Sequence, residues 1–355
     1  MKSLPKSLSN AVVFVPFIII IVILSSAPSA LAQCEEKIVA NGCHDKRESM
    51  KLKAIAFVAI LVSSMVGVCL PLFSRHVPSL SPDRDLFTVV KAFASGVILA
   101  TGYMHVLPDS FNDLMSDCLP KNPWKKFPFT TFVAMLSALF TLMVDSFAMS
   151  VYKKRFSRAS EMDGARQENG HVTIENSEYG HGHGHALELN GASSQLLRHR
   201  VIAQVLELGI VVHSVVIGLA MGASDNQCTI RSLIAALCFH QMFEGMGLGG
   251  CILQANYKFQ MKAIMVFFFS VTTPLGIILG VGLTKVYSAT SPTALIVVGL
   301  LNASSAGLLN YMALVDLLAA DFLGPKLQKN MMLQAWSYVA VLLGSGFMSL
   351  MAKWA

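Results

Sequence analysis

Long apolar segments recur along the chain and are separated by shorter polar stretches. Eight of these segments approach the length of a membrane span, near residues 54–74, 86–108, 128–150, 201–222, 232–254, 263–284, 294–316 and 333–352. A helix rises about 1.5 Å per residue, so about 20 apolar residues cross a hydrocarbon layer about 30 Å thick. A helix also pairs its own backbone N–H and C=O groups, which an open sheet in lipid cannot do. The pattern therefore predicts an all-α membrane protein with eight transmembrane helices in a bundle.

A further apolar run lies near the start of the chain, over residues 11–24. Two lysines precede it and the small residues Ala30-Leu31-Ala32 follow it, which is the order of features in a secretory signal peptide. The run is short for a membrane span and contains Pro16, so an uncleaved first helix is the weaker alternative. Residues 1–32 are therefore predicted to be a signal peptide, and residues 33–53 an extracellular segment.

The longest polar stretch, over residues 153–199, separates three spans within 54–152 from five spans within 200–355. It is rich in Glu, Asn, Ser, Gly and His and poor in large apolar residues, which predicts a disordered loop. Basic residues gather at both of its ends, as is typical of cytoplasmic loops. With this loop in the cytoplasm both termini lie outside, and the plasma membrane is the expected location.

The composition excludes an ordinary soluble chain. Hydrophobic residues make up 54% of the 355 residues and charged residues only 14%, and the mean hydropathy is +0.58. Basic cytoplasmic loops explain the net charge of +6, so no nucleic-acid partner is expected. The lipid bilayer is the expected surrounding, and a homodimer stays open.

Four of the seven cysteines fall on the predicted extracellular side, namely Cys34, Cys43, Cys118 and Cys228. An oxidising space permits two disulfides among them, and four cysteines allow three pairings. Cys34 with Cys43 is a guess among these pairings, and unpaired thiols are the alternative.

The fifth span carries the run His240-Gln241-Met242-Phe243-Glu244-Gly245. Residues four apart lie on the same face of a helix, so His240 and Glu244 can present an imidazole nitrogen and a carboxylate to one ion. His213 lies within the fourth span and can add a third ligand from a neighbouring helix. These three residues are the candidate metal ligands.

A carboxylate near the bilayer centre is costly unless a cation, a partner or water accompanies it. No lysine or arginine lies in the interior of spans four and five to neutralise Glu244. A lone histidine in a helix bundle is more often a hydrogen-bonded core residue, but two histidines and a glutamate on neighbouring spans favour a metal site. Imidazole and carboxylate without thiolate suit Zn²⁺, Fe²⁺, Mn²⁺ or Co²⁺ better than Ca²⁺ or Mg²⁺.

Glycines set the predicted helix spacing around these ligands. Gly218 and Gly222 in span four are four residues apart, as are Gly245 and Gly249 in span five. Small faces of this kind let helix backbones approach closely, and we expect them to bring the fourth and fifth spans together at the histidines. Generic membrane packing explains the same glycines equally well.

Other polar residues can line a path for an ion. His105 and Asp109 are one turn apart near the outer end of span two, although a partly exposed helix end explains them nearly as well. Glu207 lies toward the inner end of span four. There it can bind an ion that leaves the site toward the cytoplasm, or it can pair with Arg200.

In the polar loop, histidines alternate with glycine at His181, His183 and His185. Short histidine-rich tracts are typical of metal binding, and glycine offers no steric resistance to folding around an ion. We assign this tract to regulation, sensing or buffering of cytosolic metal. A solvated linker with incidental metal affinity is the alternative.

The fourth and fifth spans resemble those of the plant branch of the ZIP family, the zinc- and iron-regulated transporter-like proteins. The matching motifs are His213-Ser214-Val215-Val216-Ile217-Gly218 and His240-Gln241-Met242-Phe243-Glu244-Gly245. The resemblance covers nearly the whole mature chain, including eight spans and a histidine-bearing loop between spans three and four. It implies uptake of a divalent metal, zinc or iron(II) or both, into the cytoplasm.

Many members of that family hold two metal ions at a site shared by spans four and five. Here Ser214, Ile217 and Gln241 occupy places where the second ion would find ligands. We therefore expect a single-ion site, with Ser214 and Gln241 as auxiliary residues that contribute weakly or bind water. The family plan also fits inverted three-helix repeats that flank spans four and five, hinted at by Asp145 and Asp316 late in spans three and seven.

The expected activity is transport and not catalysis, with the metal ion as substrate and no cofactor. Zn²⁺ and Fe²⁺ are the expected substrates, and Mn²⁺ and Co²⁺ stay open. The first rival is an intramembrane metal-dependent hydrolase, although the sequence contains no His-Glu-x-x-His motif. The second is a metal exporter of the cation-diffusion type, which usually has six spans followed by a soluble domain.

Overall fold

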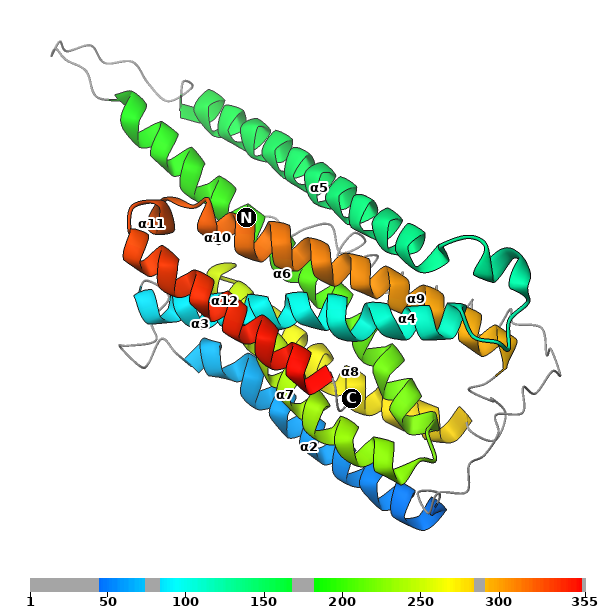
Figure 1. The fold of residues 1–355 in the computed structure, drawn as a ribbon. Coiled ribbons are helices and arrows are strands. Elements are labelled where there is room, and N and C mark those ends of the chain that lie inside the picture. Colours follow the sequence, from blue (N-terminus) through cyan, green and yellow to red (C-terminus); the bar gives the residue numbers. More distant parts are fainter. Residues whose placement is uncertain (1–44, 74–83, 168–181, 284–290, 353–355) are drawn as a thin grey trace, which may run out of the picture.

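The computed structural model describes residues 45–73, 84–167, 182–283 and 291–352, and over these ranges it contains helices and no strand (Figure 1). The predicted all-α class is confirmed. The predicted signal peptide, residues 1–32, lies outside the described residues, as do Cys34, Cys43 and His181.

The described helices follow one another in a simple order. The longer ones are α2 (Lys46–Phe73), α3 (Asp85–Ala100), α4 (Leu107–Leu114), α5 (Phe129–Gln167), α6 (Gly182–Ala223), α7 (Gln227–Gln254), α8 (Phe259–Leu283), α9 (Pro292–Tyr311) and α12 (Met331–Ala352). The shorter ones are the π-helical segments η3 (Thr101–Val106), η4 (Lys121–Lys125) and η5 (Met312–Ala319), and the short helices α10 (Ala320–Phe322) and α11 (Pro325–Gln328).

Within the described residues, seven helical segments are long and apolar enough to cross a membrane. They are Lys46–Phe73, Asp85–Leu114, Phe129–Val151, Arg198–Ala223, Phe259–Leu283, Pro292–Phe322 and Met331–Ala352, and each overlaps one predicted span. The remaining predicted span, 232–254, lies in α7, which is 28 residues long but carries His240, Gln241 and Glu244 in its middle. These polar side chains lower its mean hydropathy, so the count of eight crossings stays a prediction.

The prediction of a disordered loop over residues 153–199 is wrong for most of that stretch. α5 continues to Gln167, and α6 begins at Gly182. Lysine, arginine, glutamate, alanine and leucine are frequent in these extensions, and all five have high intrinsic helix propensity. Low hydrophobicity argues against a packed core, but it does not prevent a helix from continuing beyond the membrane.

Helix packing divides the described chain into two bundles. α2, α6, α7 and α8 pack against one another, and we call them the α7 bundle. α3, α4, α5, α9 and α12 are likewise connected, together with the short segments η3, η5, α10 and α11, and we call them the α3 bundle. Figure 1 shows α2 beside α7 at one side of the molecule and α5 along α9 at the other. The two bundles meet mainly where α3 contacts α7 and where α6 contacts α9.

Glycines bring backbones together inside each bundle. A Cβ on Gly218 of α6 would lie 2.5 Å from the Thr273 carbonyl oxygen and 2.9 Å from the Gly276 Cα, both on α8. A Cβ on Gly245 of α7 would lie 2.8 Å from the backbone nitrogen of Val68 on α2. Between the bundles the glycines meet side chains instead, as Gly247 of α7 meets the Ile98 Cδ1.

The expectation that these glycines draw α6 to α7 is therefore wrong. A helix turns about 100° per residue, so residues five and nine positions after a histidine point about 140° and 180° away from it. Gly218 and Gly222 stand in that relation to His213, and Gly245 and Gly249 stand in it to His240. The glycines let α6 pack closely on α8 and α7 pack closely on α2. The helix faces that carry His213 and His240 are therefore free to contact each other.

We expect Gly218→Ala to destabilise the protein by about 1–3 kcal/mol, because the new Cβ collides with backbone atoms of α8 that cannot rotate away. Thermal unfolding of the detergent-solubilised chain measures the change. Gly282→Ala on α8 is the matched control, since a Cβ there meets no atom within 4 Å. An equal response of the two variants would contradict close α6–α8 packing.

Candidate metal site

The predicted ligands come together in the interior of the structure. His213 lies in α6, and His240 and Glu244 lie one turn apart in α7. Each of the three offers one ligand atom, and these atoms all lie within 4.8 Å of one another. The relative exposures of His213, His240 and Glu244 are 1%, 1% and 0%, so the group is closed off from solvent.

These side chains lack the hydrogen bonds that buried polar groups normally make. Among the described residues, neither ring nitrogen of His213 or of His240 has a hydrogen-bond partner, and neither carboxylate oxygen of Glu244 has one. No ion pair to Glu244 is formed among the residues that the structure describes. Three of these atoms, one from each residue, converge, and one cation could satisfy all three at once.

A third imidazole faces the same point from the other bundle. His105 lies in the π-helical segment η3, and its ring centroid is 6.4 Å from that of His213 and 6.0 Å from that of His240. The rings of His213 and His240 are 5.8 Å apart. His105 is also buried, and its Nε2 has no hydrogen-bond partner.

The spacing of the three rings is slightly too wide for one shared ion. A metal about 2.1 Å from a ring nitrogen lies about 3.2 Å from the ring centroid. The point equidistant from the three centroids lies about 3.5 Å from each of them, so His105 would have to approach the other two rings by a few tenths of an ångström to share an ion with both. His105, predicted from sequence as a path residue, therefore lies at the edge of the group formed by His213, His240 and Glu244.

Local sequence explains how His105 reaches this position. Pro108 lacks a backbone N–H and crowds the carbonyl four residues earlier, which disfavours regular α geometry in the preceding turn. The chain forms the π-helical segment Thr101–Val106 there. Gly102 in this segment packs directly on the Asn310 side chain of α9, where a Cβ would not fit.

The auxiliary residues predicted from sequence are distributed unevenly. Ser214 and Gln241 are buried next to the two histidines, and the Ser214 Oγ and Gln241 Nε2 have no hydrogen-bond partner. Asp109 lies one turn beyond His105, is half-buried and interacts with it electrostatically. These three residues extend the polar surface around the site.

Glu207 and the loop histidines are not part of this group. Glu207 is half-buried in α6 and forms no ion pair with Arg200 among the described residues. Arg200 instead donates from its Nε to the Ala255 carbonyl at 3.1 Å, and its guanidinium lies 5.6 Å from the Tyr257 ring centroid. His183 and His185 lie in the first turns of α6, far along that helix from His213.

Two polar clusters in the structure were not predicted from the sequence. Asn302 of α9 donates to Asp113 of α4 at 3.5 Å, one turn beyond Asp109. Near the start of α3, Lys91 is buried between Asp321 and Gln254. A lysine inside a predicted span, at position 91 of 86–108, was the signal that could have revealed the second cluster.

Comparison with known proteins shows what the chain as a whole is similar to. A family model described as "ZIP Zinc transporter" matches residues 50–352. "Fe(2+) transport protein 2" of Oryza sativa subsp. japonica is 58% identical over 344 residues, which cover 91% of this chain and 90% of the relative. "Zinc transporter 7" of Arabidopsis thaliana is 58% identical over 333 residues, with coverages of 92% and 91%. "Fe(2+) transport protein 1" of Arabidopsis thaliana is 54% identical over 355 residues, with coverages of 99% and 98%.

We expect Glu244→Met to raise the stability of the metal-free protein by about 1–3 kcal/mol, because it removes two buried oxygens that have no partner. Thermal unfolding in the presence of a chelator measures this change. Glu48→Met is the control, since the Glu48 side chain is 46% exposed, and we expect it to change stability by less than about 0.5 kcal/mol. A less stable Glu244→Met protein would mean that the carboxylate has a stabilising partner.

Proposed function

The chain belongs to the ZIP family of zinc transporters, and on that premise we propose that it takes up a divalent transition-metal ion into the cytoplasm. The observation that carries the proposal is the buried group of His213, His240 and Glu244, whose ligand atoms converge without hydrogen-bond partners. A cation that visits this group compensates a carboxylate that is otherwise costly to bury in a membrane.

Zinc and iron(II) are the proposed substrates. Relatives with more than half of their residues identical are named for zinc or for Fe(2+). Imidazole and carboxylate ligands suit both ions, and they also accept Mn²⁺ and Co²⁺. Calcium and magnesium prefer shells made of oxygen alone, which three imidazoles do not provide.

Each residue has a distinct proposed role. His213, His240 and Glu244 hold the ion, and His105 supplies an imidazole from the opposite bundle. Ser214 and Gln241 adjust the polarity next to the ligands. Asp109 attracts the cation on its way to His105, and Glu207 lies on the part of α6 that leads away from the site.

Alternating access is the proposed mechanism. The ligands His213, His240 and Glu244 belong to the α7 bundle, whereas His105 belongs to the α3 bundle. The seam between the bundles therefore passes through the site. A change in how the bundles meet can expose the ion first to one side of the membrane and then to the other.

Three contacts support an orientation with both termini outside. Cys118 and Cys228 each take part in a disulfide, as expected for an oxidising space. The Lys53 Nζ lies 3.5 Å from the Oδ1 of Asp225, which is close in sequence to Cys228. The start of α2 therefore lies at the same, outer end as Cys228. Lys326, just before the start of α12, donates to the Arg84 carbonyl at 3.0 Å, just before the start of α3. Both helices therefore start at the end opposite Cys228, and α12 ends on the outer side. The plasma membrane is the proposed location.

Hydrolysis and export are less favoured activities. The relatives are named as transport proteins, not as enzymes. A hydrolase would also need a base in addition to the ligands, and Glu244 would have to serve both purposes. An exporter would move the same ions in the opposite direction, which a flux measurement separates.

Uptake of radiolabelled zinc and iron into cells that express the chain tests the proposal. We expect wild type to import metal and His240→Ala or Glu244→Ala to reduce uptake by at least about 100-fold, because each removes a ligand from a site of few ligands. Glu48→Ala, which alters an exposed carboxylate, serves as the control and is expected to transport normally. Normal import by both site variants, or efflux by wild type, would refute the proposal.

A second uptake series tests His105. We expect His105→Ala to raise KM by about tenfold, since the ion loses one imidazole while the other ligands remain. Met104→Ala is the matched control, because the neighbouring Met104 side chain is 50% exposed, whereas His105 is buried. An unchanged KM in His105→Ala would leave this histidine outside the ion's coordination.

A further inference from the structure

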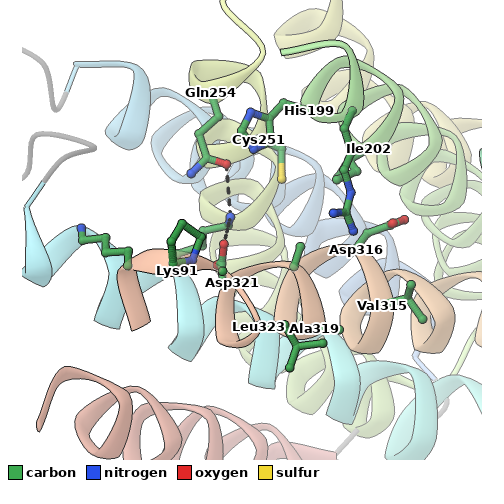
Figure 2. A pocket seen from close by; sticks show the side chains of 15 residues that line it. Lys91, His199, Ile202, Cys251, Gln254, Val315, Asp316, Ala319, Asp321 and Leu323 are labelled. Carbon is green, nitrogen blue, oxygen red and sulfur yellow. Dashed lines mark hydrogen bonds and ion pairs between the residues drawn. The ribbon is translucent and has the colours of Figure 1, made fainter. Parts of the chain in front are cut away.

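A buried lysine joins the two bundles at the end of the molecule opposite Cys228. Lys91 of α3 is only 7% exposed. Its ammonium lies 2.9 Å from the Asp321 Oδ1 of α10 and donates to the Gln254 Oε1 of α7 at 3.1 Å. Figure 2 shows the ammonium between these two acceptors.

The two acceptors differ in strength. The Asp321 carboxylate forms an ion pair with the ammonium, whereas Gln254 offers a neutral amide oxygen that adds no opposite charge. A buried ammonium without a counterion is strongly destabilising. The bond to Gln254 can therefore break while the charge of Lys91 remains compensated.

The weaker bond is also the one that crosses the seam. Lys91 and Asp321 both belong to the α3 bundle, because α3 packs on η5 and η5 leads directly into α10. Gln254 is the last residue of α7, the helix that carries His240 and Glu244. It lies ten residues after Glu244, or about 15 Å along the helix axis.

A cavity of about 560 Å³ adjoins this contact. One wall belongs to the α7 bundle and includes His199, Cys251 and Gln254, and the other belongs to the α3 bundle and includes Lys91, Asp316 and Asp321 (Figure 2). The cavity thus opens the seam at the end where the ion is proposed to leave. Both carboxylate oxygens of Asp316 are buried there and have no hydrogen-bond partner in the part of the chain that the structure describes, so the wall is polar.

We infer that Lys91 is a latch: its hydrogen bond to Gln254 holds the end of α7 against α3, and its release lets the cavity extend along the seam toward the metal site. Asp321 keeps the ammonium in place through both states. Lys91 does not contact the ion, so it is a positioning residue. This inference rests on the proposed alternating access.

The reactivity of Cys251 reports on the latch. Its thiol is free, is 3% exposed and lines the cavity. In membranes containing the full-length chain, the rate of modification by N-ethylmaleimide is followed by mass spectrometry of the Cys251 peptide. We expect Gln254→Leu, which removes the acceptor, to raise the rate by about tenfold, and Gln254→Glu, which adds a charge, to lower it by about tenfold.

General loosening would raise the rate in both variants, whereas a latch predicts opposite shifts. The added carboxylate of Gln254→Glu also disfavours a nearby thiolate directly, so the faster labelling of Gln254→Leu carries the test. Gln328→Leu is the matched control, since Gln328 donates to the Phe322 carbonyl within the α3 bundle, and we expect no change. Equal rates in wild type and both Gln254 variants, or faster labelling in both, would overturn the inference. Labelling requires no transported metal, so this outcome is independent of the uptake experiments.

A second reporter excludes an effect of Gln254 on its near neighbour. Ile202 of α6 is 3% exposed and lines the same cavity from another helix. Ile202→Cys, introduced together with Cys251→Ala, should follow the same order of rates across the Gln254 variants. A response confined to Cys251 would identify a local change in packing and would also overturn the latch.

Discussion

Burial of the Glu244 carboxylate is the constraint on which the rest of the structure depends. The Glu244 carboxylate and the imidazoles of His213 and His240 are sealed from solvent, yet none of their polar atoms has a hydrogen-bond partner among the described residues. A carboxylate buried in a membrane is costly, and a cation that enters and leaves the group, as proposed, would offset that cost. The fold places His213, His240 and Glu244 at the seam between the two bundles and not in the centre of one bundle.

The spans and the central ligands could be predicted because both depend on local sequence. The length of an apolar run locates a membrane helix, as the predicted span 263–284 and the observed α8 (Phe259–Leu283) illustrate. A spacing of four residues puts His240 and Glu244 on one face of their helix. The resemblance to the ZIP family is confirmed by the match over residues 50–352. That the three ligands bind metal stays a prediction, although the structure brings them together.

Features that depend on partners or on irregular backbone could not be predicted in the same way. His105 was expected on an outer path, because regular helical periodicity does not reveal how a π-helical segment directs a side chain. Lys91 was passed over as one charge near the start of a span, since its partners Gln254 and Asp321 are distant in sequence. The glycine faces were assigned to the wrong neighbours, although their angular positions on each helix already pointed away from the histidines.

The π-helical segment Thr101–Val106 confines one irregularity to a single turn of the chain. A π-helical turn holds about one residue more than an α-helical turn, so loss of one residue there would restore a regular helix and leave the flanking helices near their present orientation. Asp113, which lies beyond this turn beside Asn302, would keep its place against α9. The side chains within the turn would change direction instead, so a deletion here would displace His105 and not the helix that follows it.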